Sequence, residues 1–419
     1  MATLCGFLAL TVALLTAASG RLAGADGLAA GDRAALAATL VQVRDHLREG
    51  IMPYWAERSP DSRHGGFLTH LDETGQPTGT THKWLTMQTR MIWSFAAAHR
   101  HGLNDRGYLD LAEQGFAFVE EHMRDREHGG YFAVVSRSGE MLKDHKSTYQ
   151  QTFAIYAFSE LFLASGNARA LASAEALFDV FQAKARDGDL GYHEHLAADW
   201  SLREGKPLRK TLDTHMHVME CFTTLYEASG KAQHRAALEQ VVDLLLAKAI
   251  HPQDGYAYEP YDRDWVPQPG RDRAMTTMYG HNVELAWLLL EAFRVLGRDR
   301  DQHRDAVLGL IDHALTFGVD RERGGLALYG PQMGDVLDAD QLSPRRLTKS
   351  WWEQAELLVA TAEAFEWTHE QRYLLGLRST WDWTWKHQID HVHGEWFLAT
   401  DWATGAATNA GKGGDYKCA

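Results

Sequence analysis

Apolar residues in this chain recur with helical spacing in paired segments. The first member of each pair is rich in aromatic residues and alanine, whereas the second mixes apolar and charged residues as a surface helix does. First members are predicted at 87–101, 149–166, 214–230, 279–297 and 349–369. Second members are predicted at 108–123, 168–185, 232–250, 302–317 and 372–388, and one more helix at 32–49.

Six glycine signatures separate these helix pairs. Their glycines lie about 62 to 70 residues apart, and aromatic and apolar residues follow most of them, a pattern typical of β-hairpins. They are centred on Gly65-Gly66, Gly129-Gly130, Gly191, Gly255, Gly324-Gly325 and Gly394. A period of this length with two helices per unit predicts an all-α fold, one (α/α)6 toroid over residues 26–419 with short β-hairpins between helix pairs. First members would form the inner ring and second members the outer ring.

The predicted helices number eleven, although this architecture has twelve. Each inner helix begins about 20 to 28 residues after its glycine signature, so the helix that follows Gly394 would begin near residue 419. We therefore expect the toroid to be incomplete at its carboxyl end, with the last inner helix missing.

Composition excludes some partners. The net charge is -14 and the pI near 5.9, which argues against nucleic acid, because phosphate contacts need clustered Lys and Arg. The apolar stretch 7–18 has the length of a signal-peptide core and is too short to span a bilayer. We expect residues 1–25 to be a signal peptide of a secreted or periplasmic protein, or the protein to be cytoplasmic if the start codon is misassigned. Monomer and homodimer both stay open.

Polar and aromatic side chains gather in the first turns of the predicted inner helices. They are Arg90, Tyr149, Asp213, His215, His217, His281, Glu284, Trp351, Trp352 and Glu353. The amino-terminal ends of inner helices converge at one rim of a toroid, so these groups should meet in one funnel. Helix amino termini also provide positive potential that suits an anionic intermediate.

His281 and Glu284 are the strongest catalytic candidates. They lie three residues apart and share a helix face, where the carboxylate can orient the imidazole; the alternative is a histidine packed against Trp287. His215 and His217 are two residues apart, so one should face the funnel and the other the wall. Since this spacing suits no common ion and the chain has no Cys-x-x-Cys, no metal site is expected.

Arg90 lies within an apolar helix, an expensive position for a guanidinium unless it is paired or reaches a cavity. It could hold an oxyanion, or form a structural ion pair with Glu353 or Glu356. Trp351 and Trp352 cannot both face inward, so we expect one sugar-stacking platform and one core residue.

The ordered motifs resemble a known family. They include Thr89-Arg90-Met91, Asp213-Thr214-His215-Met216-His217, Gly280-His281-Asn282-Val283-Glu284, Trp351-Trp352-Glu353-Gln354 and Lys412-Gly413-Gly414. In this order they are similar to the N-acylglucosamine 2-epimerase family, which includes cellobiose 2-epimerases and mannose isomerases. The resemblance implies catalytic or sugar-contacting roles for Arg90, His217, His281 and Glu284, with Tyr149 and both tryptophans lining the funnel. Asp213 stands where cellobiose epimerases commonly carry Asn.

The resemblance also implies a reaction. A histidine removes the C2 proton of an open-chain reducing sugar, and the resulting enediolate is reprotonated at C2 to give the epimer or at C1 to give the ketose. No redox cofactor is needed, and no nicotinamide, flavin or pyridoxal signature is evident. Two alternatives remain, namely a glycoside hydrolase that uses a pair from Asp213, Glu284, Glu353 and Glu356, and a non-catalytic sugar-binding protein.

The family's second catalytic histidine follows the Lys-Gly-Gly segment in an aromatic-His pair. We expect residues 1–419 alone to epimerise sugars very slowly, because inversion needs acid or base groups on both faces of C2. Adding an inner helix that carries this pair should restore turnover, measured by NMR as formation of the epimer. Equal turnover by the two forms would contradict this expectation.

Overall fold

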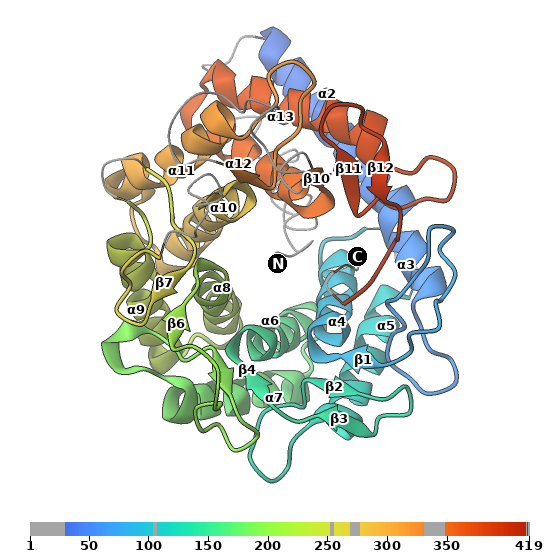
Figure 1. Cartoon of the computed structure of the whole chain (residues 1–419), viewed down its shortest axis with the longest axis vertical. Coiled ribbons are helices and arrows are strands. Elements are labelled where there is room, and N and C mark those ends of the chain that lie inside the picture. Colours follow the sequence, from blue (N-terminus) through green and yellow to red (C-terminus); the bar gives the residue numbers. More distant parts are fainter. Residues whose placement is uncertain are drawn as a thin grey trace.

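Two concentric rings of helices surround a central axis in the computed structural model (Figure 1), which describes residues 30–103, 107–251, 255–268, 277–330, 348–415 and 417. The inner ring contains α4 (Leu85–Arg100), α6 (Thr148–Ser165), α8 (Leu212–Ser229), α10 (Tyr279–Leu296) and α12 (Trp351–Thr368). The outer ring contains α2 (Ala30–His46), α3 (Met52–Arg58), α5 (Tyr108–Phe118), α7 (Ala168–Val180), α9 (Ala232–Lys248), α11 (Arg304–Phe317) and α13 (Gln371–Trp383). This is the predicted (α/α)6 architecture.

Short segments of other helix types complete the rings. A π-helical turn, η2 (Leu47–Ile51), joins α2 to α3 in one continuous rod, so the helix predicted at 32–49 extends to Arg58. Pro53 lies inside this rod, directly after the π-helical turn, and the helix continues past it to Arg58. The remaining turns are η3 (Val119–Met123), η4 (Phe181–Ala185), η5 (Gly188–Leu190), η7 (Arg300–His303) and η9 (Thr384–Gln388).

The strands mainly connect one repeat to the next. They are β1 (Lys83–Trp84), β2 (Val134–Val135), β3 (Met141–Lys143), β4 (Lys146–Ser147), β5 (His195–Leu196), β6 (Arg209–Lys210), β7 (Tyr261–Asp262), β8 (Thr277–Met278), β9 (Tyr329–Gly330), β10 (Thr348–Ser350), β11 (Ala399–Asp401) and β12 (Ala407–Asn409). β1 pairs with β2, β4 with β5, β6 with β7, β8 with β9 and β10 with β11, all antiparallel. Two hairpins, β2–β3 and β11–β12, extend these pairs. The glycine signatures themselves form tight turns closed by a single bridge, such as Pro60 with Phe67, instead of the hairpins expected there.

Five glycine turns each contain an aspartate that forms a buried ion pair with a lysine. The pairs are Asp61–Lys83, Asp125–Lys146, Asp187–Lys210, Asp320–Lys349 and Asp390–Lys412, with N–O distances of 2.6 to 3.2 Å. In four of them the lysine precedes an inner helix by two residues. Burial alone would raise the pKa of Asp125, but the hydrogen bond and charge of Lys146, together with backbone hydrogen bonds from His128 and Glu127, outweigh burial and lower that pKa. The fourth turn has His251 and Thr277 at the matching positions.

A second contact recurs at the fourth residue of each inner helix. Gln88 accepts from the backbone N–H of Phe67 and donates to its carbonyl, each at 2.8 Å. Gln151 and Gln354 bind their own turns in the same way, and Asn282 and His215 accept the matching backbone N–H. Together with the ion pairs, these bonds set the rotation of each inner helix relative to its turn.

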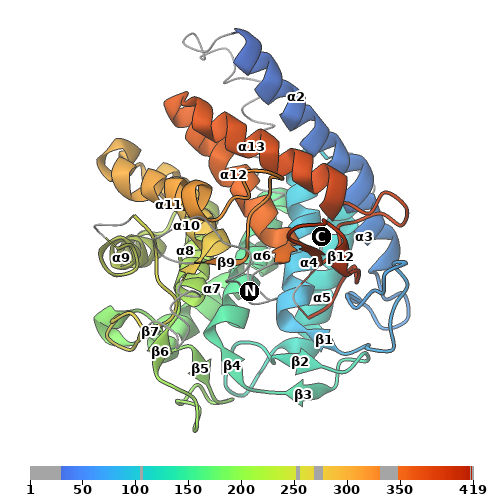
Figure 2. The ribbon, with the colours of Figure 1, turned by 45° about the horizontal axis from the view of Figure 1, so that its top comes forward.

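The outer ring closes where the first and last repeats meet. Figure 2 shows α2 running beside α13, and the Trp381 indole donates to Gln42 at 2.9 Å. The Trp396 indole likewise donates to His46 at 2.8 Å. No helix among the described residues lies between α12 and α4 in the inner ring (Figure 1).

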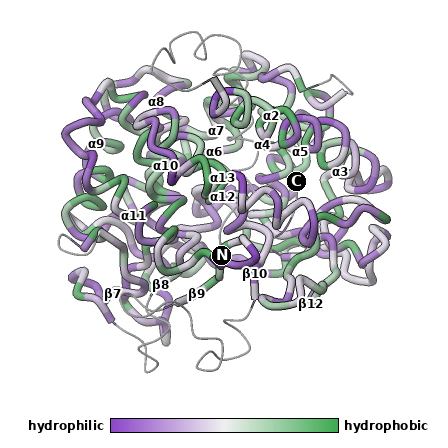
Figure 3. Tube along the Cα trace, turned by 90° about the horizontal axis from the view of Figure 1, so that it is seen from above, coloured by the Kyte–Doolittle hydropathy of each residue, from purple (hydrophilic) through white to green (hydrophobic). Residues whose placement is uncertain are grey.

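Polarity varies across the rings. In the hydropathy-coloured trace, the outer helices α9 and α11 alternate between polar and apolar stretches, as expected of helices with one face in solvent (Figure 3). Within the described residues, no helix is long and apolar enough to cross a membrane. The apolar stretch 7–18 lies outside them, so export stays a prediction, as does the homodimer.

Replacing Asp125 by Asn should lower the free energy of unfolding by about 3 to 5 kcal/mol, because the buried ammonium of Lys146 loses its counter-ion. Lys146→Met should cost a similar amount, and the double variant should cost less than the sum, because the two groups interact. Urea denaturation measures all three. Lys206→Met, which alters an exposed lysine, is the control and should change stability by about 0.5 kcal/mol or less. Wild-type stability of Asp125→Asn would contradict the proposed role of the pair.

Candidate active site

The sixth residues of the described inner helices are neighbours of one another. These residues are Arg90, Phe153, His217, Glu284 and Glu356. Each contacts or electrostatically influences the next around the ring. The Arg90 guanidinium lies 4.3 Å over the Phe153 ring, that ring lies 4.9 Å from His217, and His217 Nε2 is 3.8 Å from Glu284. The helices therefore place a cation, an imidazole and two carboxylates in one layer.

His217 is fully buried among carboxylates. Its Nδ1 is 2.8 Å from Glu220 on the next turn of α8, and its Nε2 is 3.4 Å from Asp213. Burial opposes protonation, but Asp213, Glu220 and Glu284 outweigh it and raise the pKa of His217 from 6.5 to about 9. His217 is therefore an imidazolium at neutral pH.

His281 approaches the same point from α10. Its Nδ1 is 2.5 Å from Glu259, and its Nε2 is 3.8 Å from Asp213 Oδ1, the same oxygen that lies near His217 Nε2. The Nε2 atom forms no hydrogen bond with a described residue. In the tautomer whose Nδ1–H donates to Glu259, the lone pair is on Nε2, which can then act as a base.

The expected pairing of His281 with Glu284 differs from the observed one. Glu284 points along the axis toward His217, whereas His281 bonds to Glu259 in the loop that precedes β7. Since Glu284 is buried and close to other carboxylates, its pKa is raised despite both imidazoles.

Arg90 belongs to the same environment. Its Nη2 donates to the Tyr149 hydroxyl at 2.7 Å, and the Tyr149 ring packs 5.3 Å from the His217 ring. Arg90 and His217 therefore provide positive charge on adjoining sides of the layer. Arg90 also lies close enough to Glu356 for its positive charge to act on the pKa of that carboxyl group, and the alternative expectation of an ion pair with Glu353 or Glu356 stays a prediction.

The tandem tryptophans have different surroundings. The ring of Trp352 lies 5.2 Å from His281, and a Cβ at residue 280 would come within 2.2 Å of this indole, so glycine is required there. Trp351 faces the carboxyl-terminal segment, where the Lys417 ammonium lies 5.9 Å from its ring. Trp352 is thus the tryptophan beside the histidines.

Glu353 and Glu356 form hydrogen bonds with neighbouring protein groups. Glu353 forms a capping box with Ser350, accepting from its backbone N–H at 2.6 Å and its hydroxyl at 2.7 Å, and burial raises the pKa of Glu353 to about 7. Glu356 accepts from the Trp287 indole at 2.7 Å, and burial raises its pKa well above the usual range. Neither carboxylate adjoins the two histidine Nε2 atoms as Asp213 does.

His215 lies in the wall. Its Nε2 accepts from the Tyr192 backbone at 3.1 Å, and its Nδ1 contacts the Thr211 carbonyl at 3.0 Å. It thus occupies the position that Gln88 and Gln151 hold in other repeats, which leaves His217, two residues later, to face the axis.

Three comparisons with known proteins agree with this geometry. The family model for N-acylglucosamine 2-epimerase (GlcNAc 2-epimerase) matches residues 65–416. The chain therefore belongs to the N-acylglucosamine 2-epimerase family. It is 28% identical to a cellobiose 2-epimerase of Bacteroides fragilis over 386 residues, which cover 90% of this chain and 95% of the relative. It is 29% identical over 329 residues to a D-mannose isomerase of Pseudomonas cannabina pv. alisalensis, covering 74% and 75% of the two chains.

A solved structure also matches. The cellobiose 2-epimerase from Spirochaeta thermophila superposes with a TM-score of 0.77 at 30% identity, and the match covers 91% of this chain and 94% of that one. Membership of the N-acylglucosamine 2-epimerase family and the toroid predicted from the sequence are thus both confirmed.

The sequence analysis did not identify two carboxylates of the site, Glu220 and Glu259. Glu220 lies three residues after His217, the same spacing that drew attention to His281 and Glu284, so the signal was available. Glu259 lies in a loop 22 residues before His281, and nothing in its local sequence indicated the contact.

A cavity of about 650 Å³ extends along the axis toward the carboxyl ends of the inner helices. Glu220 and Trp287 line it on the side nearest the histidine layer. Glu220 is therefore the carboxylate of the histidine layer that borders this cavity.

Glu220→Gln should lower the pKa of His217 from about 9 by about one unit or more, since a carboxylate at Nδ1 is lost. In the wild type the folded-state pKa exceeds the ordinary value of 6.5, so this ionisation stabilises the fold below about pH 6.5, and the contribution is lost as pH rises through 9. NMR titration of ring-labelled histidine measures the shift. Glu204→Gln, at an exposed site, should leave it unchanged; a His217 that titrates near 6.5 in the wild type would refute the assignment.

Proposed function

We propose that this protein is a sugar 2-epimerase or aldose–ketose isomerase that transfers the C2 proton of a free reducing sugar. The observation that carries this proposal is the convergence of two imidazoles on one point. His217 and His281 are each held at Nδ1 by a carboxylate, and both Nε2 atoms lie within 4 Å of Asp213 Oδ1. A substrate carbon placed there would have nitrogen atoms from two helices beside it.

His281 is the proposed base. Glu259 holds its Nδ1 proton, so the Nε2 lone pair is available to take the C2 hydrogen of the open-chain aldehyde. Glu259 also stabilises the imidazolium that results. Trp352 packs against His281 and limits the rotation of its ring.

Arg90 and His217 are proposed to stabilise the enediolate. A C–H bond beside a carbonyl is too weak an acid for imidazole unless the developing negative charge is stabilised, and a single well-placed donor can contribute about 3 to 4 kcal/mol. Both groups are cationic and buried in the same layer, where water screens charge poorly. Return of the proton to the opposite face of C2 would give the epimer, and delivery to C1 would give the ketose.

Substrate would enter from the side of Asp213 and Glu259. Each keeps 18% of its side chain exposed, whereas His217, His281 and Glu284 are buried. Asp213 then lies where it can accept hydrogen bonds from sugar hydroxyls, and Tyr149 and Trp352 offer ring surface on either side of it. The family relatives are cellobiose 2-epimerases and mannose isomerases, which supports glucose, mannose or a β-linked glucose disaccharide as the class to test.

Geometry disfavours the hydrolase alternative. Hydrolysis needs one protonated and one ionised carboxyl group on either side of a glycosidic bond. Glu353 accepts hydrogen bonds within its helix cap and Glu356 accepts one from the Trp287 indole, while Asp213 and Glu284 each lie within 4 Å of His217 Nε2, so an imidazole adjoins both remaining carboxyl groups.

The test is exchange of the C2 proton in deuterated water, followed by NMR with glucose, mannose, N-acetylglucosamine and cellobiose. Exchange needs a base on only one face of C2, so it reports on His281 independently of complete inversion. We expect deuterium at C2 of at least one of these sugars, and His281→Asn should slow its incorporation by about 100-fold or more.

The repeat supplies a matched pair of controls. His215→Gln should preserve exchange within about threefold, because Gln makes the same backbone contacts in other repeats, whereas His217→Gln should slow it by about 100-fold. Absence of exchange with all four sugars, or equal rates in His217→Gln and His215→Gln, would refute the proposed function.

A further inference from the structure

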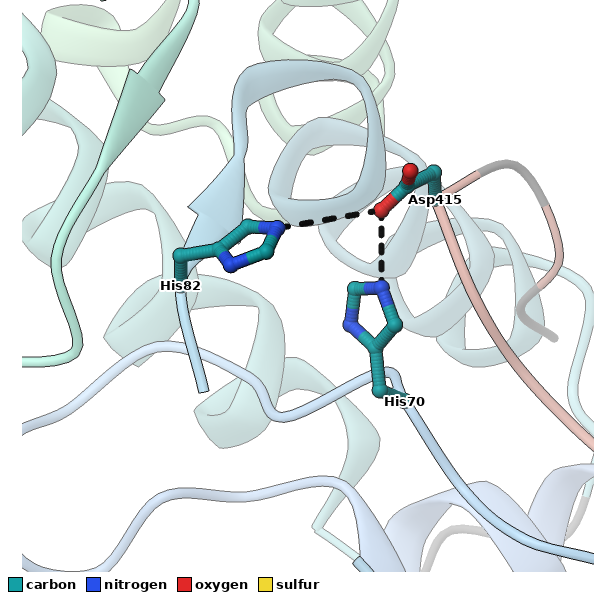
Figure 4. A group of neighbouring side chains, drawn as sticks. All are labelled: His70, His82 and Asp415. Carbon is teal, nitrogen blue, oxygen red and sulfur yellow. Dashed lines mark hydrogen bonds and ion pairs between the residues drawn. The ribbon is translucent and has the colours of Figure 1, made fainter. Parts of the chain in front are cut away.

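Three metal-ligand side chains meet where the first repeat contacts the carboxyl-terminal segment (Figure 4). His70 lies in the loop after the first glycine turn, His82 directly precedes β1, and Asp415 lies 345 positions after His70. One ligand atom from each residue lies within 4.8 Å of the others. We propose that this cluster binds a single Zn²⁺ ion, which joins the two ends of the ring.

The backbone holds the ligands in position without the ion. Lys412 and Gly413 both donate their N–H groups to the Leu71 carbonyl, at 3.2 and 3.4 Å, and the Thr69 hydroxyl donates to Gly414 at 3.5 Å. A Cβ on residue 413 would lie 2.0 Å from the Thr69 carbonyl oxygen, so the two segments meet backbone to backbone only because glycine is present. These backbone contacts therefore place Asp415 next to His70.

The ligand distances suit an ion after a small adjustment. His70 Nε2 is 2.7 Å and His82 Nε2 is 3.9 Å from Asp415 Oδ1. Ligand atoms at 2.0 to 2.1 Å from a tetrahedral ion lie about 3.3 Å apart, so the His70–Asp415 distance must open and the His82–Asp415 distance close by about 0.6 Å each. The third separation, between the two imidazole nitrogens, is at most 4.8 Å and must reach the same value. The side chains are partly exposed, at 15%, 37% and 39%, and can make this movement by torsion alone.

The donor set favours zinc. Two imidazole nitrogens and one carboxylate oxygen are borderline ligands that suit Zn²⁺ better than Mg²⁺ or Ca²⁺, which prefer oxygen. The imidazoles must be neutral to coordinate, so binding should weaken as pH falls. The exposed side of the cluster leaves a fourth position for water.

The proposed zinc site differs from the sequence-based expectation of no metal site. That expectation rested on ligand spacing within single helices, whereas these ligands come from three segments that only the closed ring brings together. The proposal is independent of the sugar chemistry, because none of the three residues belongs to the histidine layer on the axis.

Calorimetric titration of ZnCl₂ into chelator-treated protein tests the proposal. We expect one ion per chain, and His82→Ala and Asp415→Asn should each weaken binding by about tenfold or more. His391→Ala, an exposed histidine of another repeat, is the matched control and should bind as the wild type does. No binding, or stoichiometric binding that survives in both His82→Ala and Asp415→Asn, would overturn the assignment.

Thermal unfolding separates metal binding from folding. His82→Ala keeps the 2.7 Å contact between His70 and Asp415, so its melting temperature without zinc should equal that of the wild type. Zinc should raise the melting temperature of the wild type and of His391→Ala but not of His82→Ala, because only an ion bound to the folded state stabilises it. An equal zinc-induced rise in His82→Ala would contradict the site.

Discussion

The contact on which the register of the site depends is a buried ion pair between an aspartate in a glycine turn and the lysine two residues before the next inner helix, present before four of the five described inner helices. With the side chain at the fourth helical position, it fixes both where an inner helix begins and how it is rotated about its axis. A shift of one residue would turn the helix by about 100° and carry Arg90 or His217 out of the central layer. The ion pairs are buried at a desolvation cost, and their repetition supports a role in setting register as well as in stability.

Once the rotation of the inner helices is fixed, His217 and His281 differ in their electrostatic surroundings. Three carboxylates surround His217 and keep it charged, whereas His281 has one close partner and an Nε2 atom without a hydrogen bond to a described residue. One imidazole is thereby suited to stabilise negative charge and the other to accept a proton. The two histidines have different proposed roles because they have different numbers of acidic neighbours.

The first and last repeats are joined by contacts that differ from those between the other repeats. The outer ring closes there through indole hydrogen bonds, and the backbone of 412–414 lies directly against that of 69–71. A zinc ion at His70, His82 and Asp415 would add a third bond at this point, where the chain connects positions far apart in sequence. Contacts between distant positions carry the largest loop-closure cost, so a metal bridge would have its greatest effect there.

The sequence alone determined the repeat, the helix pairs and the polar first turns, because these follow from local periodicity and glycine spacing. It also singled out Arg90 and His281 as residues that should meet with one of His215 and His217, and the family resemblance favoured His217. Only the tertiary structure decided that Glu259 orients His281 and that Glu284 faces His217. Those choices depend on loop paths and on the rotation of neighbouring helices, which spacing within one helix does not encode.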